Sequence, residues 1–304
     1  MNEYHFPVMA PEAIELLDIK PDGVYADLTF GGGGHSRAIL ERLGPAGRLY
    51  GFDQDSDAKA NIPADERFVF VEGNFRFMRG LLRMHGVGQL DGVLADLGVS
   101  SHHFDSRERG FSFRFDAPLD MRMHQKGRVT AADIVNGYDE AELTRVFGTW
   151  GEIDTPWKVA SCVVRSRAQM PVATVGELIE AVEPCTPKKD PNKFLSKLFQ
   201  SLRIEANREM EALKMMLEQS LKMLRPGGRL VVISYHSLED RLVKNFMRSG
   251  TFGGNPEKDF YGRVVTPFRA LTKKALVPTD EEINLNPRSR SAKLRAAEKS
   301  GDTE

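Results

Sequence analysis

Four consecutive glycines, Gly31 to Gly34, constrain the fold of this chain more than any other stretch. They follow a segment from Val24 that predicts a short buried strand, and a helical pattern begins after them near Ser36. Glycine has no Cβ, so it adopts positive φ and lets a ligand approach the backbone. A strand, a glycine-rich turn and a helix begin the nucleotide site of a doubly wound α/β fold. A tight turn without a ligand is the alternative.

The spacing of these glycines limits the kind of nucleotide. The dinucleotide fingerprint G-x-G-x-x-G would place its last glycine at Ser36 or Arg37, so neither register fits. That glycine lets the helix pack beneath a pyrophosphate, and its absence argues against NAD and FAD. A Walker A loop is excluded because no Gly-Lys-Ser/Thr follows. An adenosine ligand without phosphate remains, and S-adenosylmethionine is the natural candidate.

Composition and cysteine content limit which class of protein this chain can belong to. The chain has 304 residues, 41% of them hydrophobic, and a net charge of -1, as in globular proteins large enough for two domains. Its two cysteines, Cys162 and Cys185, exclude a disulfide framework and suit a reducing compartment. We recognise no signal peptide and no apolar run near the roughly 20 residues that span a bilayer. We therefore expect a cytoplasmic protein without membrane association.

Three further strands are predicted, each followed by a residue that suits the same site. They cover Arg48–Asp53, Phe68–Val71 and Gly92–Ala95. The second strand ends at Asp53, about 20 to 25 residues after the glycines, where a carboxylate binds ribose hydroxyls in this fold class; a solvated turn aspartate is the alternative. Phe75 follows the third strand and either flanks an adenine or fills the core. Asp96 follows the fourth, so all three residues should lie beside one crevice.

Between about Phe104 and Phe194 the alternation of strands and helices stops. Helical patterns recur there at Thr130–Val135, Glu140–Phe147, Pro156–Ala168 and Val175–Val182. We therefore predict a helical domain inserted after the fourth strand. A long helix from about Leu198 to Leu224 and a fifth strand, Arg229–Ser234, resume the sheet domain.

Two stretches have the charge pattern of a nucleic-acid contact. Residues 107–115 interleave arginines with phenylalanines, which offers charge for phosphate and rings for unpaired bases. A loop pinned by buried rings explains this stretch equally well. Residues 286–295 are basic enough to track a phosphate backbone, although a solvated face is the commoner explanation.

Several blocks together resemble one family. They are Asp27–Gly31, Gly33–Ser36, Asp96–Ser101, Arg109–Phe113, Pro118–Met123, Phe199–Ile204, His236–Arg241 and Asn286–Ser291. Across nearly its whole length the chain resembles the bacterial MraW/RsmH family of methyltransferases, which act on N4 of a cytosine in the decoding region of 16S ribosomal RNA. The resemblance implies a class I S-adenosylmethionine-dependent methyltransferase fold, with a Rossmann-like doubly wound sheet. Residues 1–103 and 196–304 would form the methyltransferase domain, with a basic C-terminal segment, and residues 104–195 a helical insert that helps recognise RNA.

The same resemblance implies a set of cofactor contacts. They are Gly33, Gly34, His35, Asp53, Phe75 and Asp96. The family usually has a glutamine where this chain has His103. A neutral histidine can donate or accept one hydrogen bond but lacks the paired geometry of an amide. His103 takes that place in the predicted site, with S-adenosylmethionine as the cofactor.

The chemistry of an exocyclic amine defines what the catalytic residues must do. Its lone pair is delocalised into the ring, so the enzyme must orient the amine and accept hydrogen bonds as positive charge develops. Asp96 is the candidate acceptor, although it could serve the cofactor instead. Ser100 and His236 are candidate helpers, and His236 is as readily a structural histidine. Methylation at C5 would need a cysteine nucleophile, and none lies between Asp96 and Ser101.

Two other classes of function stay open on the sequence alone. One is a ribosome-assembly factor that holds the ligand without catalysis, and the other is a nicotinamide oxidoreductase, which the missing third glycine disfavours. The expected partner is 16S ribosomal RNA within the small ribosomal subunit. We expect no metal, because the chemistry requires none. The oligomeric state, monomer or homodimer, stays open.

Overall fold

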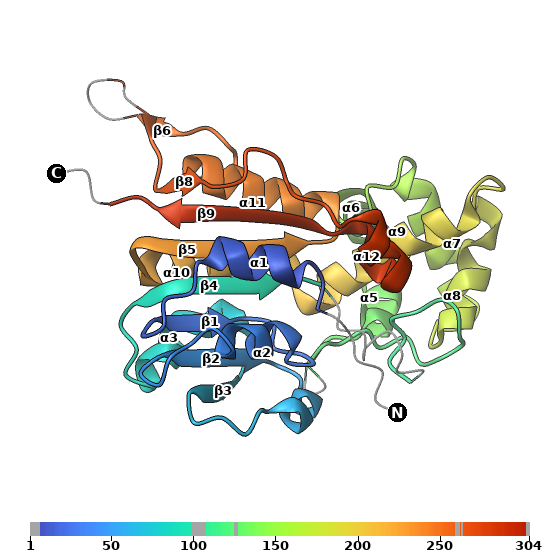
Figure 1. Cartoon of the computed structure of the whole chain (residues 1–304). Helices are drawn as coiled ribbons and strands as arrows, with labels where there is room; N and C mark the ends of the chain where they lie inside the picture. Colours follow the sequence, from blue (N-terminus) through green and yellow to red (C-terminus); the bar gives the residue numbers. More distant parts are fainter. Residues whose placement is uncertain (1–6, 99–107, 125–126, 259–261, 263, 302–304) are drawn as a thin grey trace. The chain divides into compact units, whose positions relative to one another are not determined.

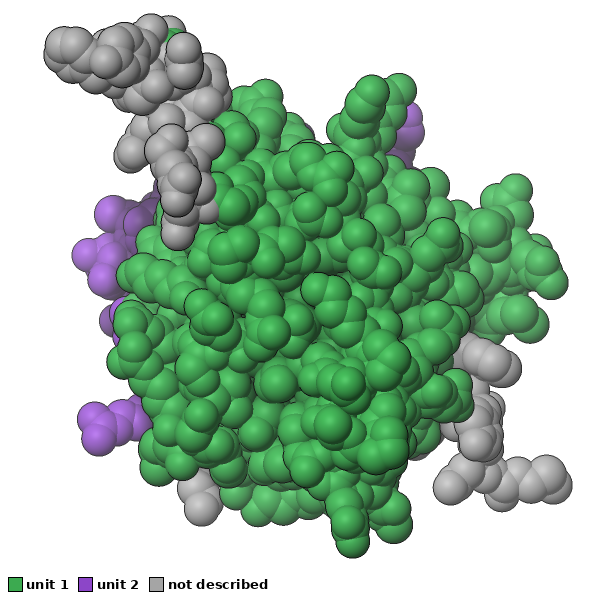
Figure 2. All heavy atoms as spheres, turned by 60° about the vertical axis from the view of Figure 1, so that its left-hand side comes forward, with its two compact units in different colours: residues 1–98, 210–304 green, residues 99–209 purple. Residues whose placement is uncertain are grey.

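The computed structural model describes residues 7–98, 108–124, 127–258, 262 and 264–301. The chain divides into two compact units (Figure 2). Unit 1 comprises residues 1–98 and 210–304, and unit 2 comprises residues 99–209. Two separate segments of the sequence therefore build unit 1, as expected if unit 2 is an insertion.

A seven-stranded sheet forms the centre of unit 1 (Figure 1). The strands are β1 (Val24–Asp27), β2 (Arg48–Asp53), β3 (Phe68–Glu72), β4 (Leu90–Asp96), β5 (Leu224–Ser234), β8 (Phe268–Ala270) and β9 (Lys293–Lys299). Their order is β3-β2-β1-β4-β5-β9-β8, with β1 to β5 parallel and β9 antiparallel to both its neighbours. The chain runs outward from β1 to β3 and resumes at β4 on the other side of β1. This topology confirms the predicted class I fold and places its switch point between β1 and β4.

Helices cover both faces of this sheet. On one face lie α1 (Ala10–Leu17) and α2 (Gly34–Leu40), and on the other α3 (Met78–Met84), α10 (Glu209–Met223) and α11 (Ser237–Ser249) (Figure 1). The shorter elements are η1 (Ser56–Asn61), η2 (Phe75–Phe77), α12 (Asp280–Leu285), η4 (Pro287–Ser291) and the strand pair β6 (Glu257–Lys258) and β7 (Val264–Val265). Within the described ranges, no helix has both the length and the apolar character needed to cross a membrane.

The inner strands carry nearly continuous runs of buried side chains. Residues 90–95 of β4 are all buried, as are the last three residues of β1. Parallel strands covered on both faces show such runs rather than a strict apolar and polar alternation. The short apolar runs therefore identified the strands. They carry no periodicity that would show which strands lie next to each other in the sheet.

Substitution of Gly92 in β4 tests this close packing. A Cβ at Gly92 would lie 2.8 Å from side-chain atoms of Leu17 and Tyr25, so alanine overpacks a buried site. We expect Gly92→Ala to lose about 1–3 kcal/mol of unfolding free energy, measured by urea denaturation. In the control Gly88→Ala, the new Cβ would meet nothing within 4 Å. Equal unfolding midpoints for the two variants would contradict this packing.

Unit 2 is helical and has an apolar core of its own. Its helices are α5 (Ala131–Gly137), α6 (Glu140–Thr149), α7 (Pro156–Arg167), α8 (Val175–Val182), η3 (Glu183–Cys185) and α9 (Pro191–Asn207). Three of them begin with a capping box. In it the N-cap side chain accepts a hydrogen bond from the backbone N–H three residues later, and the acidic side chain at that later position accepts one from the N-cap backbone N–H. The pairs are Thr130 with Asp133, Asp139 with Glu142, and Thr174 with Glu177. These local signals fix the helix starts.

The end of the insert differs from the sequence prediction. The apolar periodicity predicts one helix from Leu198 to Leu224, but α9 ends at Asn207 and Arg208 adopts a left-handed conformation with φ of 52°. A second helix, α10, then begins at Glu209. The apolar face of α9 packs into the core of unit 2. Unit 2 therefore extends to residue 209 rather than 195, and it begins at residue 99 rather than 104.

Part of the basic C-terminal segment lies in the sheet. Residues Lys293–Lys299 form β9, which pairs with β5 and β8. Arg295 donates from Nε to Oδ1 of Asp240 at 2.7 Å, so α11 neutralises that charge. Arg288 and Arg290 are exposed in η4. In the second half of the basic stretch at residues 286–295, Lys293 and Arg295 are both paired with Asp240, so the exposed arginines of its first half are the better candidates for phosphate.

Candidate functional site

The glycine turn after β1 is held in a conformation that needs glycine. Gly31 and Gly33 have φ values of 49° and 73°, in the left-handed region that side chains disfavour. A Cβ at Gly33 would lie 3.0 Å from the Phe30 ring, and one at Gly34 would lie 2.9 Å from Pro7. Gly32 is exposed and a Cβ there would meet nothing within 4 Å. The turn is therefore packed on one side and open at Gly32, as close approach of a ligand requires.

Asp27 joins β1 to the helix that follows the turn. It is fully buried, and its Oδ2 accepts a hydrogen bond from Oγ of Ser36 at 2.6 Å. Its Oδ1 accepts from the backbone N–H of Thr29 at 3.1 Å. Burial raises the pKa of the Asp27 carboxyl group. No role of its own was predicted for this residue from the sequence, although a carboxylate inside a buried strand was the available signal.

Asp53 lies at the carboxyl end of β2, beside the glycine turn. Its Oδ2 accepts from the N–H of Gly31 at 2.8 Å and its Oδ1 from the N–H of Asp55 at 2.8 Å. A carboxylate has about four lone-pair sites, so about two remain for further donors. Burial raises the pKa of Asp53 to about 6, against these hydrogen bonds that lower it. The remaining lone pairs fit the two hydroxyl groups of a ribose.

Phe75 follows β3 and opens the short helix η2. Its ring is half-buried. The preceding residue, Asn74, accepts from the N–H of Arg76 and donates from Nδ2 to Oε1 of Gln54 at 2.7 Å. The bond to Gln54 ties the loop after β3 to the loop after β2. A partly exposed ring held next to the Asp53 strand suits an adenine.

Asp96 ends β4 at the switch point and is held on several sides. Its N–H donates to Oγ1 of Thr29 at 2.7 Å, and its Oδ1 accepts from the hydroxyl of Tyr235 at 2.7 Å. Nδ1 of His35 lies 3.8 Å from its Oδ2, while Nε2 of that histidine lies 3.0 Å from the carbonyl oxygen of Val8. The Asp96 side chain is 21% exposed. Burial raises its pKa to about 6.

His236 serves as the N-cap of α11. Its Nδ1 accepts from the N–H of Glu239, and Oε2 of Glu239 accepts from the N–H groups of Tyr235 and His236. Its Nε2 lies 3.2 Å from Oε1 of the same glutamate. These contacts support the structural alternative, so a catalytic role of His236 stays a prediction. The other two predicted site residues, Ser100 and His103, lie outside the described residues.

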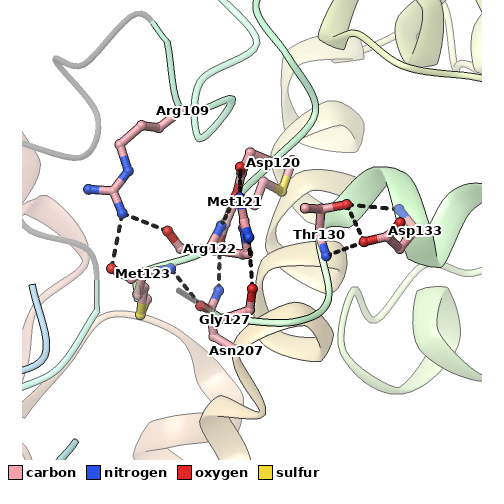
Figure 3. Close-up of polar contacts among 9 residues, drawn as sticks. All are labelled: Arg109, Asp120, Met121, Arg122, Met123, Gly127, Thr130, Asp133 and Asn207. Atoms are coloured by element: carbon pink, nitrogen blue, oxygen red, sulfur yellow. Dashed lines mark hydrogen bonds and ion pairs between the residues drawn. The ribbon is translucent and has the colours of Figure 1, made fainter. Parts of the chain in front are cut away.

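Two arginines of the arginine-rich loop of unit 2, Arg109 and Arg122, donate hydrogen bonds to residues 120–127 (Figure 3). The guanidinium of Arg109 donates to the carbonyl oxygens of Arg122 and Met123, at 2.6 and 3.0 Å. Arg122 binds Asp120 with both arms, at 2.7 and 2.6 Å, and donates to the carbonyl oxygen of Gly127 at 2.7 Å. These bonds shape the loop. Neither arginine is therefore placed primarily to bind phosphate.

The rings of the same loop divide into buried and exposed ones. Phe111 is 5% exposed, and Phe113 packs against Phe199 with ring centroids 5.5 Å apart. Phe115 is 41% exposed. Of the two interpretations of residues 107–115, the described contacts favour the loop pinned by buried rings. Arg107, which belongs to that stretch, lies outside the described residues.

Comparison with known proteins gives a consistent assignment. The model of the MraW methylase family matches residues 2–300. A protein of Parabacteroides distasonis named ribosomal RNA small subunit methyltransferase H is 59% identical over 297 residues, which are 97% of each chain. Proteins of the same name from Bacteroides fragilis and Flavobacterium johnsoniae are 55% identical, over 97% and 98% of each chain.

Similarity to solved structures is weaker. An rRNA methylase from Streptococcus thermophilus matches with a TM-score of 0.40 and 13% identity, covering 96% of this chain and 94% of that chain. The assignment therefore depends on the sequence comparisons. A family match across nearly the whole length, together with relatives of this identity, shows that the chain belongs to the MraW methylase family and is a methyltransferase.

Proposed function

We propose that the chain transfers the methyl group of S-adenosylmethionine to N4 of a cytidine in the decoding region of 16S ribosomal RNA. It would act in the cytoplasm on the small ribosomal subunit. Its relatives carry the name of a small-subunit ribosomal RNA methyltransferase, and its sequence blocks resemble the cytosine-N4 enzymes. The observation that carries the proposal is the placement of the Asp96 carboxyl group at the switch point, beside the glycine turn.

The residues at the switch point fit the proposed cofactor. When bound, S-adenosylmethionine supplies an electrophilic methyl group on a positively charged sulfur. Asp53 offers acceptor sites for the ribose, and Phe75 offers a ring for the adenine. The open side of the turn at Gly32 provides space next to them. The absence of a phosphate-binding fingerprint agrees with a cofactor that has no phosphate.

Asp96 is the proposed acceptor for the amine. Transfer of the methyl group to N4 would leave the electron pair of the broken carbon–sulfur bond on sulfur and would leave the nitrogen with a proton to lose, which Asp96 is placed to accept. Tyr235 occupies Oδ1 of Asp96. Nδ1 of His35 lies 3.8 Å from Oδ2, beyond hydrogen-bond distance, so Oδ2 keeps lone pairs to orient the amine and receive that proton. A carboxylate with a pKa near 6 is a stronger base than an ordinary aspartate. The target base must leave its stack to reach this carboxylate.

The direct test of the proposed function is nucleoside analysis of the product. Purified protein is incubated with small ribosomal subunits that lack the modification and with methyl-labelled S-adenosylmethionine. We expect label in a cytidine, at N4. Label at C5 of a pyrimidine, or in protein only, would reject the proposed function.

The pH dependence of turnover should report the ionisation of Asp96. Because its raised pKa of about 6 belongs to the free protein and the carboxylate is the active form, kcat/KM should rise through about pH 6 and then level off. The hydrogen bond from Tyr235 lowers the pKa of Asp96. Tyr235→Phe should therefore move the acid limb to higher pH, measured by initial rates across pH 5–8. The control Tyr50→Phe should leave the limb in place, and an unmoved limb in Tyr235→Phe would contradict this role.

Membership of a methylase family decides against the two alternatives left by the sequence. A nicotinamide oxidoreductase would need a site for a pyrophosphate, which the glycine spacing does not provide. An assembly factor without catalysis would have no use for a base at the switch point. The helical insert and the surface arginines Arg288 and Arg290 are the proposed contributors to RNA binding.

A further inference from the structure

A hollow on unit 1, outside the predicted cofactor contacts, gathers cationic side chains around an exposed ring. It lies between the segment η2–α3 and helix α10 and has a volume of about 440 Å³. The lining residues that matter here are Arg76, Phe77, Arg79, Arg83, Glu218 and Lys222. Four of the six are cationic and one is acidic, whereas the whole chain has a net charge of -1. The hollow is therefore a local concentration of positive charge.

The two walls of this hollow are tied together by one glutamine. Oε1 of Gln219, on α10, accepts from the N–H of Arg79 at 2.8 Å. Its Nε2 donates to the carbonyl oxygens of Arg76 and Met215, at 2.5 and 3.0 Å. The link spans 140 residues of sequence. It fixes the backbone that carries the arginines, so the hollow is a built feature of the fold.

Three of the cations have no acid beside them in the part of the chain that the structure describes. Among the described residues, no carboxylate oxygen lies within 4.0 Å of the charged groups of Arg79, Arg83 or Lys222. Elsewhere in unit 1 the contrast is clear, since Arg67 is paired with Asp65 at 2.6 Å. Arginine guanidinium groups without a carboxylate partner suit phosphate, which they bind with two parallel hydrogen bonds.

The ring in the hollow is placed to stack on a base. Phe77 is 57% exposed, which is unusual for a phenylalanine. The guanidinium of Arg76 lies 6.0 Å from the centre of that ring. An exposed ring beside arginines is the arrangement that binds single-stranded nucleic acid, because every base can stack on it. An acidic peptide would use the cations but not the ring.

We propose that this hollow binds a single-stranded segment of RNA, with phosphates on Arg79, Arg83 and Lys222 and an unpaired base on Phe77. The inference rests on the proposed function, in which the substrate is ribosomal RNA. It adds a second RNA contact, on the methyltransferase unit itself and apart from the helical insert. The contact would anchor the strand while another nucleotide occupies the switch point.

The test compares full-length variants with the same change in charge. Arg79→Glu with Arg83→Glu removes two phosphate contacts, and Phe77→Ala removes the ring. Arg42→Glu with Lys244→Glu is the control, because both residues are exposed and lie outside the hollow. Binding of a fluorescent oligouridylate is measured by anisotropy over a salt series, and methylation of small ribosomal subunits is followed by initial rates. The affinity for S-adenosylmethionine and the unfolding midpoint establish that each variant is folded. If the double charge reversal is not folded, the neutral double variant Arg79→Gln with Arg83→Gln replaces it.

The proposal makes different predictions for each variant. The double reversal should weaken oligouridylate binding by at least about tenfold and lower the salt slope by about 1.4, because each lost phosphate contact on a single strand contributes about 0.7. KM for the subunit should rise while kcat at saturation stays unchanged. Phe77→Ala should weaken binding by about tenfold without changing the slope, and the control should match the parent protein.

Two results would overturn the proposal. In the first, the double charge reversal and the control variant weaken oligouridylate binding equally. In the second, Phe77→Ala binds oligouridylate as tightly as the parent protein does, and an oligoglutamate peptide displaces the oligonucleotide completely. Failure of the proposed function is a separate outcome. A parent protein that binds oligouridylate through this hollow but methylates no RNA supports the hollow and rejects the function. A parent protein that methylates RNA while all variants match the control rejects only the hollow.

Discussion

Replacing Asp96 with asparagine is expected to lower kcat by about 10²–10⁴-fold, the range that a positioned general base contributes. An amide cannot take the proton that the amine releases, although its oxygen can still accept the hydrogen bond from Tyr235. The dissociation constant for S-adenosylmethionine, measured by calorimetry, should change little. The exposed carboxylate Asp22 provides a matched control, because Asp22→Asn removes the same charge outside the site.

The same substitution should stabilise the protein. Asp96 has a folded pKa of about 6 against a reference value of 3.8. Because the pKa of Asp96 is raised in the folded protein, its protonated carboxyl group makes its full contribution to the free energy of unfolding below about pH 4. That contribution is lost as the pH rises through about 6. A neutral amide in place of the ionised carboxylate should therefore raise the unfolding free energy at pH 7, by up to about 3 kcal/mol, and not at pH 4. A large loss of cofactor affinity with little loss of kcat would instead assign Asp96 to the cofactor.

Replacing Asp53 with alanine should weaken S-adenosylmethionine binding by about 100-fold or more. The change removes two hydrogen bonds from hydroxyl groups to a charged acceptor, each worth about 1.5–3 kcal/mol. Asp53→Asn should lie between the parent protein and Asp53→Ala, because an amide keeps one acceptor oxygen. At saturating cofactor, kcat should recover, which separates this residue from Asp96.

The affinity for the cofactor should also fall as pH drops. Burial raises the pKa of Asp53 to about 6, and a protonated carboxyl group accepts fewer hydrogen bonds than a carboxylate. The dissociation constant should therefore rise below about pH 6 in the parent protein and stay flat in Asp53→Asn. Glu66→Gln, an exposed acid before β3, is the control. If Asp53→Ala bound the cofactor as tightly as Glu66→Gln, the ribose would lie elsewhere.

The central part of the fold could be predicted because its signals are local. The glycine turn follows a buried strand within a few residues, and the carboxylates Asp53 and Asp96 end their strands where the pattern places them. The helices of unit 2 were equally accessible, since capping boxes at Thr130 and Thr174 mark their starts. Turn chemistry, capping and short apolar runs are all encoded in neighbouring residues.

The parts of the fold and of the site that the sequence did not predict depend on contacts between residues far apart in the chain. β9 alternates only weakly and carries charges, so its place in the sheet follows from pairing with β5, more than 50 residues earlier in the chain. The break at Arg208 has no glycine or proline to mark it. The support of Asp96 comes from Tyr235, which is 139 residues away. Periodicity cannot reveal which two side chains meet across a sheet.

A crystal structure of the protein with bound S-adenosylmethionine would show how the cofactor lies at the switch point. We expect ribose hydroxyls within hydrogen-bond distance of the Asp53 carboxylate and the methyl carbon directed toward Asp96, with the adenine against Phe75. A cofactor bound with its methyl group turned away from Asp96, or with its ribose out of reach of Asp53, would contradict this expectation.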